Sequence, residues 1–170
     1  MQKGPLLGQG RTAEVYAWGD FQVLKLFFTT WPVDWIHQEA WVTRLVHEAG
    51  LASPAAGDIV EVEGRLGIVY ERVDGSSMLE DVARHPWRVV SLARQFTDLH
   101  LAMHRTTLEK LPGGRELLTG LLRAAPRLSD EVKGRLLGKL DQLPDQETIC
   151  HGDYHPDNIL MARRGPIVID

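Results

Sequence analysis

The chain has 170 residues, of which 44% are hydrophobic and 25% are charged. A chain of this length buries about 70% of its unfolded surface, which is enough for one domain or two small lobes. The net charge is −4, with 23 acidic and 19 basic side chains scattered along the sequence, so a nucleic-acid partner is not expected.

Signals for a membrane or for secretion are not found in the sequence. No apolar run approaches the ~18 residues of a membrane span, and the first ten residues lack a signal-peptide core. The single cysteine, Cys150, cannot form an internal disulfide. We therefore expect a cytoplasmic protein with no membrane partner. Residues 148–150 indicate a short buried strand, so we interpret Cys150 as a core residue and not as a nucleophile.

The chain opens with a strand, a glycine turn and a second strand. Residues 6–7 lead into Gly8 and Gly10, and residues 14–18 have the composition of a strand. Because glycine permits positive φ and has no Cβ, such a turn can lay backbone N–H groups over phosphates. A plain hairpin is the alternative, since Ala13 replaces the third glycine of a GxGxxG pattern. A Rossmann unit does not fit, because a strand and not a helix follows the glycines.

The next strand and helix each carry one charge among apolar residues. Residues 22–28 are apolar on both faces except at Lys25, and an inward lysine requires a counter-charge. In the helix between Pro32 and Gly50, Glu39 interrupts an apolar stripe, so the two charges are most simply explained as an ion pair. The alternative is that Lys25 extends outward to solvent and Glu39 lies at the rim of the stripe. The predicted stripe comprises Trp35, Val42, Val46 and Ala49.

Two further strands and a change to helical composition follow. Residues 58–63 and 65–71 flank Gly64 and complete about five strands of a small antiparallel sheet. The pattern breaks at residues 73–75, and the chain becomes helical from Ser76, where Ser76 and Ser77 provide a helix cap. The expected helices cover residues 76–85, 89–103, 115–125 and 129–143.

The last twenty residues, HGDYHPDNILMARRGPIVID, contain the strongest motif. Two apolar runs, at residues 158–161 and 166–170, are separated by a basic turn with a glycine and predict a hairpin. Asp153 precedes the first strand, Asn158 opens it and Asp170 closes the second. Two carboxylates and one amide oxygen at the same edge suit a hard divalent cation that bridges phosphates.

The histidines and acids of this stretch allow other interpretations. Asp153, Asp157 and Asn158 could simply form turns. Alternatively, an extended segment would point alternate side chains one way and could hold zinc for hydrolysis. That zinc set comprises His151, Asp153, His155 and Asp157. His100 and His104 also have zinc-ligand spacing on a helix, but we interpret them as packing or surface residues because no third ligand is near them in the sequence.

The order Asp153, Asn158 and Asp170 matches the catalytic Asp, metal-binding Asn and metal-binding Asp of eukaryotic-type kinases. With His151-Gly152-Asp153 in place of His-Arg-Asp, the stretch resembles the aminoglycoside phosphotransferase and choline kinase-like family, whose signature is HGDxHxxN and a strand ending in Asp. This resemblance implies an α+β, bilobal kinase-like fold. Residues 1–73 would form a small antiparallel-sheet lobe with one helix, and residues 74–170 part of a helical lobe.

The resemblance also implies a reaction and a set of site residues. The family transfers the γ-phosphoryl group of ATP to a hydroxyl of a small molecule, with GTP open as another donor. Asp153 would orient the hydroxyl and accept its proton, and Asn158 and Asp170 would hold Mg²⁺. Lys25 and Glu39 would clamp the phosphates under the Gly8 and Gly10 turn. The backbone of Glu71 and Val73 would contact the adenine edge, with Tyr70 at the back of the pocket and His151 supporting the loop.

Family members continue beyond the metal-binding Asp, whereas this sequence ends at Asp170. We therefore expect either a fragment of a longer phosphotransferase or a truncated product of weak activity and low stability. A nucleotide-binding module without turnover is the second hypothesis. The acceptor stays open among aminoglycosides, macrolides, choline, homoserine and other sugars or amino alcohols, and the sequence predicts no oligomeric state.

Overall fold

The computed structural model describes residues 3–108, 110–111, 113–144 and 148–170. It divides into two compact units, Met1–Met103 with Cys150–Asp170, and His104–Ile149. Each unit is described separately below. The lobe boundary expected near residue 73 stays a prediction. In the described residues, no helix has both the length and the apolar character needed to cross a membrane.

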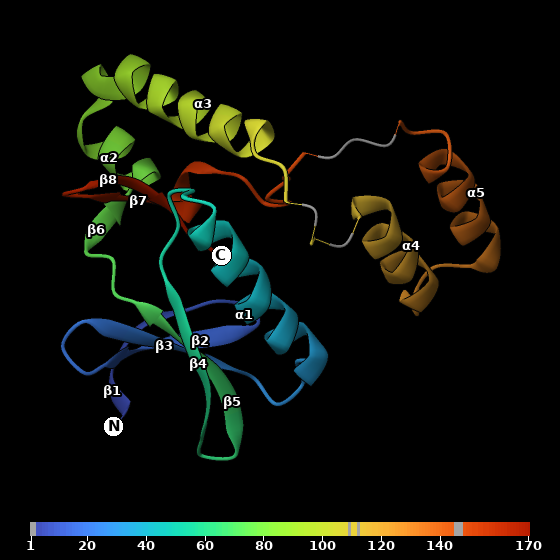
Figure 1. Cartoon of the computed structure of the whole chain (residues 1–170), viewed down its shortest axis with the longest axis horizontal. Helices are drawn as coiled ribbons and strands as arrows, with labels where there is room; N and C mark the ends of the chain where they lie inside the picture. Colours follow the sequence, from blue (N-terminus) through green and yellow to red (C-terminus); the bar gives the residue numbers. More distant parts are fainter. Residues whose placement is uncertain (1–2, 109, 112, 145–147) are drawn as a thin grey trace. The chain divides into compact units, whose positions relative to one another are not determined.

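The first unit contains a five-stranded antiparallel sheet with the strand order β1-β2-β3-β5-β4 (Figure 1). The five strands expected from the sequence are therefore confirmed. Leu24, Leu26 and Val69 form a cluster with Trp18 on one face, while Phe27, Ile68 and Tyr70 face the other. The strands are β1 (Lys3–Gln9), β2 (Ala13–Trp18), β3 (Gln22–Phe27), β4 (Ala56–Val62) and β5 (Arg65–Glu71).

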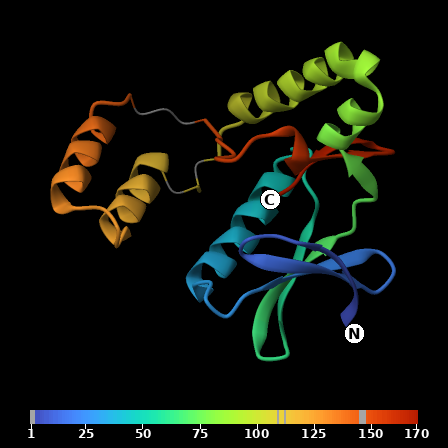
Figure 2. The same cartoon turned by 180° about the vertical axis from the view of Figure 1, so that it is seen from behind.

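Helix α1 (Val33–Glu48) covers one face of this sheet, as both views show (Figure 1, Figure 2). Ile36 and Ala40 are its buried residues and pack on Phe27, Ile68 and Tyr70.

The predicted apolar stripe of α1 is wrong by about one position. Trp35 is 36% exposed and contacts Trp31 edge-on, and Ala49 is exposed as well. The face that packs on the sheet is centred on Ile36 and Ala40. Glu39 therefore lies at the edge of the buried face and not in its middle.

The rest of the first unit combines a small sheet with two helices. Strand β6 (Gly75–Ser77) pairs with β7 (Ile159–Ala162), which forms the predicted hairpin with β8 (Gly165–Val168). Ser77 accepts a hydrogen bond from the Glu80 N–H and caps α2 (Met78–Arg84), as expected. A short 3₁₀ turn (Pro86–Arg88) leads into α3 (Val89–Arg105). Met78, Leu92 and Ile159 form the core between these elements.

The second unit contains α4 (Gly114–Ala124) and α5 (Asp130–Leu140). The guanidinium of Arg115 donates to the carbonyls of Leu140 and Leu143, so α4 is tied to the end of α5. Helix α5 ends three residues before the predicted Leu143. The sequence also predicts a loop that begins at Pro112, and this residue lies outside the described residues.

The expectation that Cys150 is a core residue in a short buried strand is wrong. Residues 148–150 form no strand, and Cys150 is exposed while Ile149 is buried. A single apolar residue next to the polar loop is enough to explain the apolar pattern that suggested a strand.

We expect Gly67→Ala to lower the free energy of unfolding by about 1–3 kcal/mol, because its Cβ would lie 2.7 Å from Leu24 Cδ1 and 2.9 Å from the Lys25 carbonyl oxygen. Gly134→Ala in α5 is the control, since among the described residues nothing lies within 4 Å of its added Cβ. That variant should be neutral or stabilising. Urea denaturation followed by circular dichroism measures both, and equal stability of the two variants would contradict the packing described here.

Candidate active site

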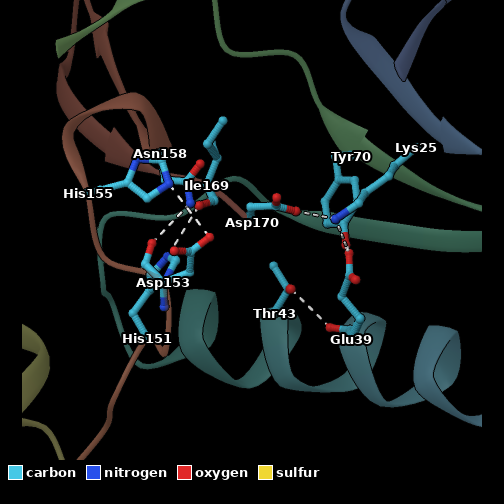
Figure 3. Close-up of polar contacts among 10 residues, drawn as sticks. All are labelled: Lys25, Glu39, Thr43, Tyr70, His151, Asp153, His155, Asn158, Ile169 and Asp170. Carbon is cyan, nitrogen blue, oxygen red and sulfur yellow. Dashed lines mark hydrogen bonds and ion pairs between the residues drawn. The ribbon is translucent and has the colours of Figure 1, made fainter. Parts of the chain in front are cut away.

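Lys25 and Glu39 form the ion pair expected from the sequence. The Lys25 Nζ on β3 lies 2.9 Å from Glu39 Oε1 on α1, and the two side chains are 14% and 28% exposed (Figure 3). The alternative in which Lys25 extends to solvent is therefore wrong. The pair joins the central strand of the sheet to the helix that covers it.

Tyr70 holds the same carboxylate from a second side. Its hydroxyl donates to Glu39 Oε1 over 2.9 Å. The strand register explains this, because Lys25 pairs with Ile68 and Val23 pairs with Tyr70, so the lysine and the tyrosine are diagonal neighbours on one face. Burial, and then the charge of Glu39, raise the pKa of Tyr70 far above its ordinary value, so the hydroxyl stays a donor. Nothing in the sequence predicted this contact between Tyr70 and Glu39.

Asp170 is the second carboxylate on Lys25. Its Oδ1 contacts the Lys25 Nζ, and its side chain is 57% exposed. Burial lowers the pKa of Lys25, but the charges of Glu39 and Asp170 outweigh burial, and the pKa lies above its ordinary value. The ammonium group is therefore charged and lies between two carboxylates (Figure 3).

Backbone and side-chain hydrogen bonds bring the other motif residues to the same end of the hairpin. The Ile169 N–H donates to the Asn158 carbonyl over 2.9 Å, so Asp170 follows directly beside Asn158. The Asn158 Nδ2 donates to the Asp153 carbonyl over 3.0 Å and holds the loop (Figure 3). The sequence expectation that Asp153, Asn158 and Asp170 gather at one edge thus has a structural basis.

These three residues fit a hard divalent cation by their chemistry. The Asn158 amide uses its nitrogen for the loop, which leaves its oxygen as the atom that could bind a metal. Asp153 is 71% exposed and Asp170 57% exposed, so both carboxylates are accessible to an ion that keeps several waters. In this structure the Asp170 carboxylate contacts Lys25.

The structure lacks the extended segment that the zinc alternative requires. The segment is not extended, because Pro156–Asn158 forms a 3₁₀ turn. His151 faces the Ile169 carbonyl at 3.2 Å, His155 Nδ1 accepts from the Asp157 N–H, and Asp157 accepts from the Ser77 hydroxyl. Within the described ranges, no group of three or more His, Cys, Asp or Glu side chains is placed to hold a metal.

Tyr154 anchors the loop that carries Asp153. Its hydroxyl donates to the Phe96 carbonyl on α3 over 2.6 Å, and its ring lies 4.3 Å from the Phe96 ring and 4.8 Å from the His100 ring. Burial raises the pKa of Tyr154 to about 12. His100 is a packing residue, as expected. The only sequence signal for this anchor was a single aromatic residue in an otherwise polar loop.

The glycine turn lies in line with Lys25 across the sheet. Gly8 pairs with Val15, and Val15 pairs with Lys25 on the next strand. Gly8 belongs to β1, and the Gly10 N–H donates to the Ala13 carbonyl over 2.9 Å and closes the turn. The Gly10 amide is therefore used within the turn in this structure.

Glu71 and Val73 lie where the five-stranded sheet leads into β6. Glu71 is the last residue of β5, and its N–H donates to the Ala55 carbonyl over 2.9 Å. Val73 follows in the segment between β5 and β6. Their contact with an adenine edge stays a prediction.

Comparison with known proteins shows the family and the fold of the chain. A model of the family described as "Phosphotransferase enzyme family" matches residues 4–170. The chain belongs to the phosphotransferase enzyme family. Its fold is similar to a crystal structure of an aminoglycoside-3′-phosphotransferase of type VIII, with a TM-score of 0.65 and 21% sequence identity over 99% of this chain and 70% of that chain. A search of curated proteins found no match.

The structural match confirms the α+β, kinase-like fold of this phosphotransferase, with an antiparallel-sheet lobe, one helix on it, and further helices. The five-stranded sheet with α1 is the part that carries Lys25 and Glu39. The roles of individual residues are not decided by this likeness, because at this identity it concerns the fold alone.

We expect Tyr70→Phe to lower the free energy of unfolding by about 1–3 kcal/mol, because a hydrogen bond to a charged group is lost. The effect should be strongly non-additive with Glu39→Gln, since both changes act on one contact. Urea denaturation of the single and double variants measures the coupling. Tyr16→Phe on the same sheet is the control, because its hydroxyl bonds to Glu14 and not to Glu39, so its effect should add to that of Glu39→Gln. Additive effects of Tyr70→Phe and Glu39→Gln would show that this contact does not form in solution.

Proposed function

We propose that the protein transfers the γ-phosphoryl group of ATP to a hydroxyl group of a small molecule. The observation that supports this most is the convergence of a charged, largely buried lysine with Asp153, Asn158 and Asp170 within one compact unit. Membership of the phosphotransferase family supports the reaction class. GTP is a second candidate donor.

Lys25 is the proposed phosphate-binding residue. Its ammonium group is oriented by Glu39, which is itself fixed by Tyr70. A charged lysine held in this way can contact the α- and β-phosphates without a large loss of side-chain entropy on binding. The glycine turn from Gly8 to Gly10 lies two strands away on the same row and would cover the phosphates.

Asn158 and Asp170 are the proposed ligands of Mg²⁺. Their oxygens would hold the ion, which would supply positive charge against the negative charge that develops on the phosphates during transfer. Because Asp170 contacts Lys25 through Oδ1 in this structure, its carboxylate would turn from Lys25 or bind the ion through its other oxygen. Lys25 would keep Glu39 as its partner during that change.

Asp153 is the proposed catalytic residue. Its exposed carboxylate would accept a hydrogen bond from the acceptor hydroxyl and then its proton, while the hydroxyl oxygen bonds to the γ-phosphorus and ADP leaves. The loop that carries Asp153 is fixed by Tyr154 on one side and by Asn158 on the other.

The acceptor is proposed only as a small molecule with a hydroxyl group. The similar crystal structure is of an aminoglycoside-3′-phosphotransferase, which makes aminoglycosides the first compounds to test. Macrolides, choline, homoserine and other amino alcohols complete the panel. We place the reaction in the cytoplasm, where ATP is available.

A nucleotide-binding protein without turnover is the second candidate function. The contact between Lys25 and Asp170 favours it, since that contact occupies one carboxylate oxygen of the proposed metal ligand. Magnesium-dependent ATP turnover with the acceptor panel separates the two functions. Turnover with any acceptor supports the transferase, and tight nucleotide binding with no turnover supports the second candidate.

We expect Asp153→Ala to lower turnover by roughly 10²–10⁴-fold and to leave nucleotide affinity unchanged, because it removes the group that orients and deprotonates the acceptor. Asp157→Ala is the matched control, since Asp157 lies in the same loop but contacts Ser77. Turnover is measured by ADP release and affinity by calorimetry. A turnover of Asp153→Ala within twofold of the wild type, or an equal loss in both variants, would refute this role.

A further inference from the structure

An ion pair joins the end of β5 to the turn of the β7–β8 hairpin. The guanidinium of Arg164 donates two hydrogen bonds to the Glu71 carboxylate, Nη1 to Oε1 over 2.6 Å and Nη2 to Oε2 over 2.8 Å. The two residues are 93 positions apart in the sequence. Such a two-point contact fixes both distance and orientation, unlike the single contact that a lysine would make.

The two ends of this contact belong to different parts of the proposed nucleotide site. Glu71 opens the segment whose backbone is the candidate for contact with the base. Arg164 lies at the turn of the hairpin whose opposite end carries Asn158 and Asp170. The hairpin is also tied at that opposite end, where the Val168 N–H donates to the Ala52 carbonyl over 2.7 Å. It is thus attached at both ends of β8.

The contact is better suited to fix geometry than to stabilise the fold. The Arg164 and Glu71 side chains are 50% and 32% exposed, and exposed ion pairs contribute little to stability. The hydrogen bonds from Arg164 nevertheless lower the pKa of Glu71, and a long contact from the Ala55 N–H acts in the same direction. Glu71 is therefore a charged acceptor at neutral pH.

We propose that Glu71 and Arg164 are a positioning pair, which holds the hairpin bearing Asn158 and Asp170 in register with the strand end that leads to the base-contacting backbone. The inference rests on the proposed function, because it requires that the base and the phosphates of one nucleotide bind to the two parts of the site that the pair connects. Neither side chain is a catalytic residue. The pair acts by fixing the distance between the part of the site that receives the base and the part that receives the phosphates.

The test is a charge-reversal cycle with Glu71→Arg, Arg164→Glu and the double variant, in the full 170-residue chain. Hydrogen exchange of the β7 and β8 amides is measured without nucleotide, and the Kd for Mg·ATP by calorimetry. We expect each single variant to speed exchange and to raise Kd by about three- to tenfold. The double variant should restore both readouts, because the exchanged arginine and glutamate can form the same two-point contact in reverse.

Two further variants sharpen the comparison. Arg163→Glu changes the same charge in the same turn at an exposed residue and should leave both readouts at the wild-type level. Arg164→Lys keeps the charge but not the two-point geometry, so it should resemble Arg164→Glu more than the wild type. All the substituted side chains are at least partly exposed, and circular dichroism checks that each variant is folded.

The outcomes separate the inference from the function on which it rests. A double variant as impaired as the singles, or an Arg163→Glu variant as impaired as Arg164→Glu, would overturn the pair. Altered exchange with an unchanged Kd in all variants would overturn its role in positioning the nucleotide site. If the wild type bound no Mg·ATP, the proposed function would fail, and the exchange cycle alone would then support or refute the attachment of the hairpin.

Discussion

One largely buried cation, the ammonium group of Lys25, links the elements of this structure. Lys25 projects from β3, the central strand of the sheet, on the face that α1 covers, and its side chain is only 14% exposed. A charge in such a position requires carboxylate partners. Glu39 comes from α1 and Asp170 from the end of the β7–β8 hairpin, so one ammonium group connects the sheet, the helix and the hairpin.

The two carboxylates are not equivalent partners. Glu39 is 28% exposed and is fixed by the Tyr70 hydroxyl, whereas Asp170 is 57% exposed. Breaking a buried, hydrogen-bonded pair costs far more than breaking an exposed one. Breaking the contact between Asp170 and Lys25 should therefore cost less free energy than breaking the contact between Glu39 and Lys25. This asymmetry supports a site in which Lys25 remains oriented while Asp170 becomes available to a metal.

The sequence predicted the elements whose residue types require a partner or a turn. Two apolar runs around a basic turn with a glycine predicted the hairpin, and the places of Asp153, Asn158 and Asp170 at its ends predicted their common edge. A lone lysine on an apolar strand predicted its ion pair with Glu39. These predictions worked because charge burial and turn formation are local constraints that a sequence displays directly.

Contacts that depend on exact register were not predictable. The buried face of α1 differs from the predicted stripe by one position. Trp35 packs on Trp31, and Ile36 packs on the sheet in its place. The anchor of Tyr154 on α3 and the pairing of Arg164 with Glu71 join residues far apart in the sequence. Polar side chains of these types are common on surfaces, so only the fold shows which of them meet.

The most direct test is to measure the affinity for Mn²⁺ in the presence of ATP by electron paramagnetic resonance. If the hairpin end is the metal site, Asn158→Ala and Asp170→Asn should each weaken Mn²⁺ binding in the nucleotide complex by at least about tenfold, and Asp157→Asn should not. Equal Mn²⁺ affinity in all three variants and the wild type would contradict the central claim that this end of the hairpin holds the metal of a phosphotransferase site.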